Sequence, residues 1–127
     1  MLIAYWCVLI AALLPYGWVI VAKASPAYDN RAPRAQLAKA DGYRQRANWA
    51  HMNAFEAFAP FAAGVVIAQL SGAAQGWVNA LAMIFIGARV LHGVFYILDR
   101  PTLRSLAWAT GMGCVIGLFL VAARVVS

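Results

Sequence analysis

Charged and polar side chains recur at helical spacing inside two stretches of this sequence that are otherwise apolar. The first set consists of Arg46, Trp49, Asn53, Glu56 and Pro60. The other set occurs later in the chain with the same spacing: Phe85, Arg89, His92, Tyr96 and Asp99. Residues three and four apart share one face of an α-helix, so each set predicts a polar stripe. Ionisable groups inside an apolar helix need a partner or a function, and each stripe therefore faces something other than lipid.

The two stripes place opposite charges at the same depth. Glu56 lies ten residues after Arg46, and Arg89 lies ten residues before Asp99. Each charge is thus about 15 Å into its helix, at a rise of 1.5 Å per residue. Antiparallel helices, in one subunit or in neighbouring subunits, would bring Glu56 to Arg89. The pair is either a buried structural ion pair or part of a ligand site, because a carboxylate can also accept a ligand ammonium.

Three further side chains allow both a structural and a functional interpretation. His92 is either a hydrogen-bonded core histidine or a ligand contact, and we expect no metal site because its helix carries no second ligand at metal-binding spacing. Tyr96 is either an interfacial aromatic residue or part of a site. Arg104 lies near the start of the last apolar stretch, where a helix N-terminus and a guanidinium both favour an anion. The alternative for Arg104 is a flanking arginine that sets orientation.

The composition determines which elements carry these residues. Of 127 residues, 65% are hydrophobic and 11% are charged, against about half and a quarter in soluble domains. A spanning helix needs about 20 apolar residues. We therefore predict an all-α integral membrane protein with one domain, residues 1–127, that forms a four-transmembrane-helix bundle. Its spans are predicted at residues 2–22, 48–70, 77–98 and 106–123.

Basic residues predict the orientation of this bundle. Eight of the ten basic residues fall in the first and third connections or in the helix ends beside them, including the loop 23–46. Basic residues gather in cytoplasmic loops, so we predict a cytoplasmic loop 23–46 and periplasmic termini. The net charge of +6 is explained better by this rule than by a nucleic-acid partner. Within the loop we expect a short helix over residues 33–40, and Asp41 is expected to cap a long helix that ends near Leu70.

The chain resembles the MAPEG family, the membrane-associated proteins in eicosanoid and glutathione metabolism, over essentially its full length. The most specific part is a pattern on the second long helix, with Asn seven residues after Arg, Glu three further on and Pro four after that: Arg46, Asn53, Glu56 and Pro60. Residues 89–96 and 100–105 are similar to the third helix and the fourth-helix entry of family members. Residues 28–34 look like those of bacterial members.

The resemblance implies a homotrimer in the bacterial inner membrane, with glutathione bound between subunits as a co-substrate. It implies a glutathione pocket formed by six side chains: Arg46, Asn53, Glu56, His92, Tyr96 and Arg104. By the same resemblance Arg104 and Ser105 are catalytic, with Arg104 holding the glutathione thiolate. The implied function is a glutathione-dependent transferase or peroxidase acting on lipophilic electrophiles.

Two positions depart from the family. Trp49 and Met52 stand where animal members commonly have arginines that bind glutathione carboxylates. Losing two cations removes about 3–6 kcal/mol of charge-assisted binding. A non-catalytic MAPEG-fold protein that binds another anionic or lipid ligand is therefore the alternative, and the question of enzymatic activity stays open. A small multidrug exporter is disfavoured, because residues 2–22 contain no acidic residue.

Overall fold

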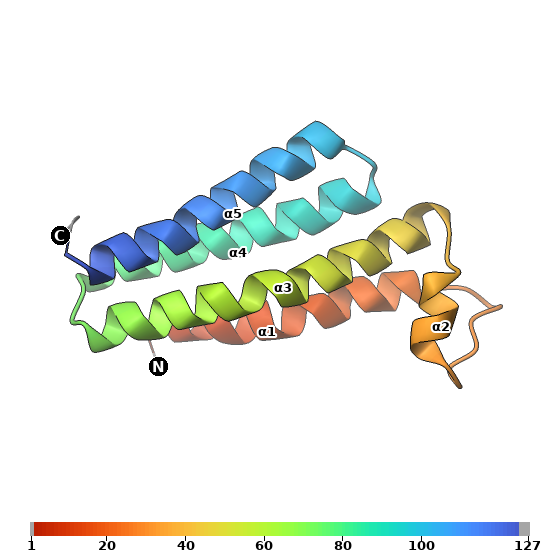
Figure 1. Cartoon of the computed structure of the whole chain (residues 1–127), viewed down its shortest axis with the longest axis horizontal. Coiled ribbons are helices and arrows are strands. Elements are labelled where there is room, and N and C mark those ends of the chain that lie inside the picture. Colours follow the sequence, from red (N-terminus) through yellow and green to blue (C-terminus); the bar gives the residue numbers. More distant parts are fainter. Residues whose placement is uncertain (1, 125–127) are drawn as a thin grey trace.

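The structure, a computed structural model, describes residues 2–124 and contains five helices (Figure 1). Their bounds are α1 Ile3–Ala22, α2 Pro33–Ala38, α3 Gly42–Leu70, α4 Gln75–Ile97 and α5 Pro101–Ala122. All helices except α2 are long and apolar enough to cross a membrane. The predicted all-α class and four-helix bundle are confirmed.

The helix starts have local causes. Helix α5 begins at Pro101, earlier than the predicted span, because proline fits the first turn, where its missing N–H has no partner in any case. Asp41 is at the N-cap of α3 as expected, but its side chain makes no capping hydrogen bond. Gly42 follows with φ of +57°, a conformation that glycine adopts without strain. This residue turns the chain from the short α2 into α3.

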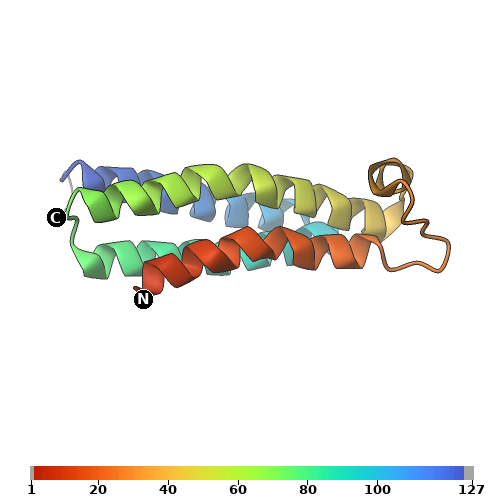
Figure 2. The same ribbon diagram turned by 90° about the horizontal axis from the view of Figure 1, so that it is seen from below.

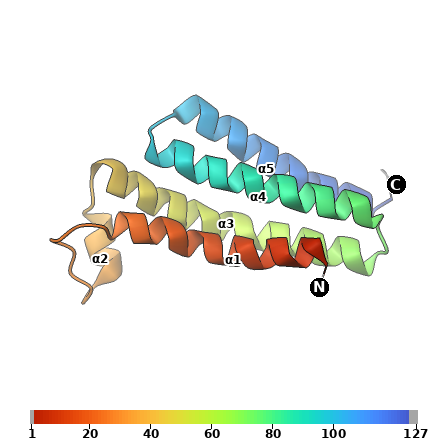
Figure 3. The same cartoon turned by 180° about the vertical axis from the view of Figure 1, so that it is seen from behind.

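The four long helices run antiparallel to their sequence neighbours and form two packed pairs. Helix α1 lies beside α3, and α4 lies beside α5, in all three ribbon views (Figures 1, 2 and 3). The described ends of the chain and the α3–α4 turn lie at one end of the bundle, whereas α2 and the α4–α5 connection lie at the other (Figure 1). Helix α2 crosses the bundle axis at that end. The basic loop residues and the entry to α5 are thereby brought together.

The core between the pairs is formed by small residues and two stacked aromatic rings. Phe61 of α3 and Phe85 of α4 stack with centroids 3.9 Å apart and planes 5° apart. Both rings are buried, among alanines and valines from all four long helices. The stack fixes the relative depth of the two helices that carry the polar stripes.

Helix α1 is held against α4 and α3 beside those stripes. The indole of Trp18 lies directly on Gly93 of α4, where a side-chain methyl group would overlap the ring. The ring Nδ1 of His51 on α3 lies 2.9 Å from the Pro15 carbonyl oxygen of α1. Since a carbonyl only accepts, Nδ1–H donates this bond. Helix α1 thus packs against both α3 and α4.

Candidate functional site

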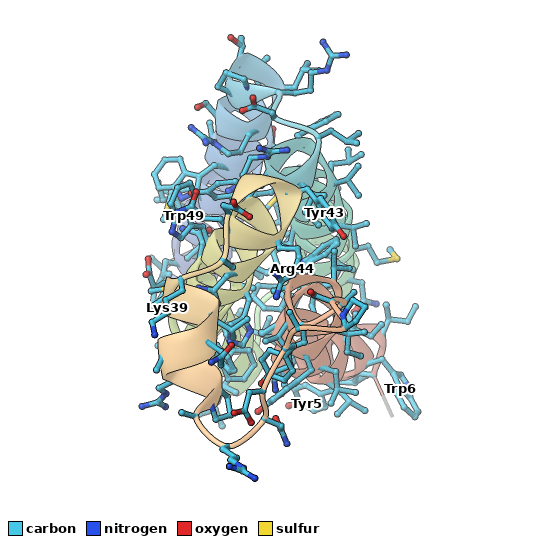
Figure 4. The ribbon with its side chains drawn as sticks, turned by 90° about the vertical axis from the view of Figure 1, so that its right-hand side faces the viewer. Tyr5, Trp6, Lys39, Tyr43, Arg44 and Trp49 are labelled. Atoms are coloured by element: carbon cyan, nitrogen blue, oxygen red, sulfur yellow. The ribbon has the colours of Figure 1, made fainter. Side chains whose placement is uncertain are left out.

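Two arginines in the first turns of α3 bind the C-terminal ends of the neighbouring helices. Arg44 donates from Nε to the Ala22 carbonyl of α1 at 3.0 Å, and Arg46 donates from Nε to the Ile97 carbonyl of α4 at 3.0 Å. The last carbonyls of a helix lack intrahelical donors and carry a partial negative charge, so both contacts are favourable. Figure 4 shows Arg44 pointing toward α1 at this end of the bundle.

The contact with Ile97 gives Arg46 a structural partner that the sequence did not predict. In the described chain its Nε joins the start of α3 to the end of α4, and Arg46 is not among the residues that line the hollows described below. Its predicted contact with glutathione stays a prediction.

Several predicted site residues surround one hollow at the α2 end of the bundle. This Arg104 hollow has a volume of about 270 Å³. It is lined by residues of α3, α4 and α5: Asn53, His92, Tyr96, Arg104, Ser105 and Trp108. Five of these are predicted site residues, and three different helices bring them together.

Arg104 lies directly over the ring of Tyr96. Its guanidinium carbon is 4.7 Å from the ring centroid, a cation–π arrangement across the short α4–α5 connection. The imidazole of His92 meets the same tyrosine edge to face, with centroids 5.6 Å apart. The contact of Arg104 with Tyr96 joins the end of α4 to the start of α5. The contact keeps the Arg104 guanidinium at the wall of the Arg104 hollow.

His92 has a buried nitrogen that lacks a partner in the described chain. The residue is 3% exposed, and its Nδ1 makes no hydrogen bond there. Buried polar atoms are nearly always paired, with protein, water or ligand. His92 also lines the Arg104 hollow, so its imidazole lies at the wall of that hollow.

The structure gives Arg89 a different partner from the predicted one. Arg89 is 4% exposed and donates from Nη2 to Oδ1 of Asn53 at 2.7 Å. Within residues 2–124 no direct ion pair joins Arg89 to Glu56, although both line a smaller hollow of about 160 Å³. Arg89 is buried and its Nη2 binds Asn53, whereas Glu56 is exposed to solvent in the single chain. An ion pair within one subunit is thus not formed.

Glu56 also lines a third hollow together with Trp49, which stands where animal members of the resembled family commonly have an arginine. This Trp49 hollow has a volume of about 420 Å³ and is bounded by Trp49, Met52, Asn53, Glu56 and Tyr96. The rings of Trp49 and Tyr96 lie 6.2 Å apart between centroids. In Figure 4 Trp49 lies on the outer side of the bundle, consistent with its exposure.

The part of the 160 Å³ hollow that α5 forms was not predicted from the sequence. Its apolar lining on that helix consists of Gly111, Met112 and Val115, next to Trp108. These residues follow Arg104 at spacings of three and four, so they continue the face of α5 that carries the arginine. That periodicity was the available signal, but apolar residues in an apolar helix do not stand out.

Comparison with known proteins identifies the family of the chain. The model of the MAPEG family matches residues 3–124, nearly the whole sequence. No curated protein and no solved structure matches the chain. Together with its four apolar helices, the match shows that the chain is an integral membrane protein and belongs to the MAPEG family.

Proposed function

We propose that the protein is a glutathione-dependent membrane enzyme, a transferase or peroxidase that acts on lipophilic electrophiles. The observation that carries this proposal is the Arg104 hollow, whose lining includes the cationic Arg104 and three polar residues, Asn53, His92 and Ser105. These groups fit a thiolate and the polar backbone of a peptide. MAPEG membership supports the same co-substrate.

Arg104 has the chemistry needed to activate a thiol. A free thiol has a pKa near 8.5 and is mostly protonated at neutral pH, whereas a nearby cation favours the nucleophilic thiolate. The Ser105 hydroxyl lines the same hollow and could donate a hydrogen bond to the sulfur. In transfer, the sulfur forms a bond to the electrophilic carbon, the leaving group departs with its electron pair, and the thiol proton goes to solvent. In peroxide reduction, the thiolate attacks one peroxide oxygen, the O–O bond breaks, and the other oxygen leaves with its electron pair and takes up a proton to give an alcohol. A second glutathione then attacks the sulfur of the resulting sulfenic acid, which forms the disulfide and releases water.

The electrophile would enter from the bilayer. The 160 Å³ hollow adjoins the Arg104 hollow through Asn53 and Trp108 and is lined further in by apolar groups, among them Phe85 and Val115. An apolar space of this kind suits the hydrocarbon part of a small lipophilic molecule. The reacting carbon or oxygen would then lie between the lipid-facing helices and the thiolate.

Assembly as a homotrimer would cover the exposed polar side of α3. Glu56 is exposed in the single chain, although it lies within a helix apolar enough to span a membrane. A carboxylate facing lipid is costly, so a neighbouring subunit or a ligand must cover it. The eight basic residues gathered at the α2 end support a cytoplasmic position for that end, in a bacterial inner membrane with periplasmic termini.

A second candidate is a non-catalytic member that binds a lipid. It is favoured by a hollow of about 480 Å³ between α2 and α3. Arg34 lines it at the α2 side and Glu56 at the α3 side, together with the apolar Leu37, Met52 and Phe55. A cation beside an apolar wall suits an acidic lipid headgroup with its chain.

A thiolate difference spectrum separates the two candidates. Glutathione is added to detergent-purified protein at pH 7, and the ultraviolet absorbance of the thiolate is recorded against glutathione alone. The enzyme predicts saturable thiolate absorbance and conjugation of a lipophilic electrophile. If neither appears and an acidic phospholipid binds instead, the non-catalytic candidate is correct.

A further inference from the structure

The hollow of about 160 Å³ between α3, α4 and α5 has a buried cation in its lining. This cation is Arg89, which is 4% exposed. Within residues 2–124 its guanidinium makes one hydrogen bond, from Nη2 to Oδ1 of Asn53 at 2.7 Å. A guanidinium carries several N–H donors, so most of its donor capacity is not used by the described chain.

The same hydrogen bond fixes the orientation of the Asn53 amide. A guanidinium has donors and no acceptor, so the amide oxygen and not the amide nitrogen faces Arg89. The Nδ2 group of Asn53 therefore keeps its N–H donors for another partner. Asn53 lines the 160 Å³ hollow together with Arg89. The polar part of this lining consequently offers hydrogen-bond donors from two helices.

A neutral group that accepts hydrogen bonds fits these donors. A carbonyl oxygen can accept more than one hydrogen bond, and so can bind the guanidinium and the amide together. A carboxylate fits less well, because Glu56 lines the same hollow and like charges repel. The α5 side of the hollow is apolar, with Met112 and Val115, and suits a hydrocarbon chain attached to the oxygen.

The neighbouring Arg104 hollow relates this oxygen position to a reaction. Asn53 and Trp108 line both hollows, so a molecule in the 160 Å³ hollow is adjacent to the place proposed for the thiolate. When a thiolate attacks an α,β-unsaturated carbonyl compound, negative charge develops on the carbonyl oxygen. Donors that are already in place where such charge develops stabilise the transition state strongly.

We propose that Arg89 and Asn53 form an oxyanion site, and that the electrophile is a neutral α,β-unsaturated carbonyl compound with a hydrocarbon chain. The sulfur bonds to the β-carbon, the alkene electron pair forms a new double bond to the carbonyl carbon, and the carbonyl electron pair moves to oxygen as an enolate. The α-carbon then takes a proton from water, the carbonyl is restored, and no leaving group departs. This inference rests on the proposed function, because it takes the thiolate to lie at Arg104.

The test compares two electrophiles with the same carbon chain. trans-2-Octenal has the carbonyl oxygen, whereas trans-1-chloro-2-octene lacks it and reacts by loss of chloride. For each, the rate of conjugation by the detergent-purified protein is divided by the uncatalysed rate at the same glutathione concentration. We expect the acceleration to be about 100-fold larger for octenal, the usual effect of one oxyanion donor.

Arg89→Lys tests the guanidinium. The variant keeps the charge but loses the planar group that can bind the Asn53 oxygen and the substrate oxygen together. We expect it to lose most of the acceleration of octenal conjugation and to change that of chloro-octene little. Thiolate absorbance recorded without any electrophile should stay as in the wild-type protein, and it shows that the co-substrate site is intact.

Two glycines of α5 provide a matched pair that tests the location of the electrophile. Gly111→Ala places a methyl group 3.6 Å from Cδ of Arg89, an ordinary contact distance, and narrows the hollow that Gly111 lines. It should raise the KM of both electrophiles. Gly113→Ala meets nothing within 4 Å and should leave both KM values unchanged.

An infrared measurement on the wild-type protein needs no variant at Arg89. 2-Octanone labelled with ¹³C at the carbonyl has the acceptor oxygen but no alkene, so it binds without reacting. A hydrogen bond from a guanidinium lowers the C=O stretching frequency. We expect the protein to add a band at lower frequency than the band of the ketone in detergent alone, and Gly111→Ala should weaken this added band.

The outcomes separate this inference from the proposed function. Equal acceleration of octenal and chloro-octene, or equal losses of both in Arg89→Lys, overturns the inference and leaves the enzyme intact. An unshifted carbonyl band also overturns it, and this band decides the matter if Arg89→Lys does not fold. Absence of thiolate with glutathione in the wild-type protein overturns the proposed function, and the inference with it.

Discussion

The buried guanidinium of Arg89 donates a hydrogen bond to the side-chain oxygen of Asn53 at 2.7 Å and joins α4 to α3 in the middle of the polar site. Asn53 also lines all three hollows around which the site is organised. The contact therefore affects both the stability of the bundle and the shape of the site.

Removing the amide should leave the Arg89 charge buried without its described partner. We expect Asn53→Leu to lower the free energy of unfolding in detergent by about 1.5–3 kcal/mol, the usual value of a hydrogen bond to a charged group. A double-mutant cycle with Arg89→Leu measures the coupling. We expect it to exceed the coupling between Glu56→Gln and Arg89→Leu, since Glu56 makes no direct ion pair in the described chain. Additivity of Asn53→Leu and Arg89→Leu would contradict the structural role of the contact.

The contact between Trp18 and Gly93 predicts opposite effects of the same substitution at two glycines of α4. Gly93→Ala places a methyl group in the indole and should destabilise the protein by about 1–3 kcal/mol. Gly87→Ala meets nothing within 4 Å, and alanine in a helix should stabilise by about 0.5–1 kcal/mol. Thermal unfolding in detergent measures both. If both variants change the unfolding temperature in the same direction, the described contact of Trp18 with Gly93 is contradicted.

The number and order of the long helices followed from the sequence, because apolar runs, prolines and glycine-rich turns are local features. Helix α3 ends at the predicted Leu70, and three residues of the two polar stripes, Asn53, His92 and Tyr96, line one hollow. Helical periodicity fixes which residues share a face, so this part of the site was predictable. Arg104, which the spacing did not include, lines the same hollow.

The partners of the arginines did not follow from the sequence. Arg89 and Glu56 were paired because both lie at the same distance from the end of their helices. A long side chain can also reach a residue one helical turn away, and Arg89 binds Asn53. Arg46 was predicted to bind a ligand, yet its Nε binds the Ile97 carbonyl. Such partners depend on where another helix ends and how the helices are rotated. Residue spacing along one helix does not contain that information.

The two arginine contacts at helix ends provide a matched pair of variants. Arg46→Met and Arg44→Met should each destabilise the protein by about 1 kcal/mol, because each leaves a helix-end carbonyl without its donor. Only Arg46→Met should also weaken thiolate formation, because the last turn of α4 carries Tyr96. Unfolding and thiolate titrations of both variants test this. An equal effect of both on thiolate formation would show that Arg46 does not position the site.

The orientation of the bundle is tested by cysteine labelling in intact cells. With Cys7 and Cys114 replaced by alanine, Ser127→Cys should react with a membrane-impermeant maleimide, because the termini are predicted to be periplasmic. Ser127 lies outside the described residues, and the prediction rests on the charge distribution alone. Thr102→Cys, in the exposed start of α5, should react only after membrane disruption. The reverse labelling pattern would contradict the predicted topology.

The last prediction concerns the role of Arg104 in thiol activation. The structure places its guanidinium over Tyr96 at the wall of the hollow that contains Ser105. Lowering the pKa of a thiol by two units requires about 2.7 kcal/mol of preferential interaction with the thiolate. Arg104→Lys keeps the charge, and hence the basic flank of α5, but loses the planar group that can bind a thiolate while it stacks on an aromatic ring.

We therefore expect Arg104→Lys to insert and assemble normally while losing most thiolate absorbance at neutral pH. Titration of the bound thiol should show its pKa moving upward toward the free value of about 8.5, so that thiolate reappears only in alkaline solution. Arg100→Lys is the control, since Arg100 is exposed and does not line the described hollow; it should titrate like the wild-type protein. If Arg104→Lys retains the thiolate at neutral pH, positive charge at this position is sufficient and a specific role of the guanidinium is excluded.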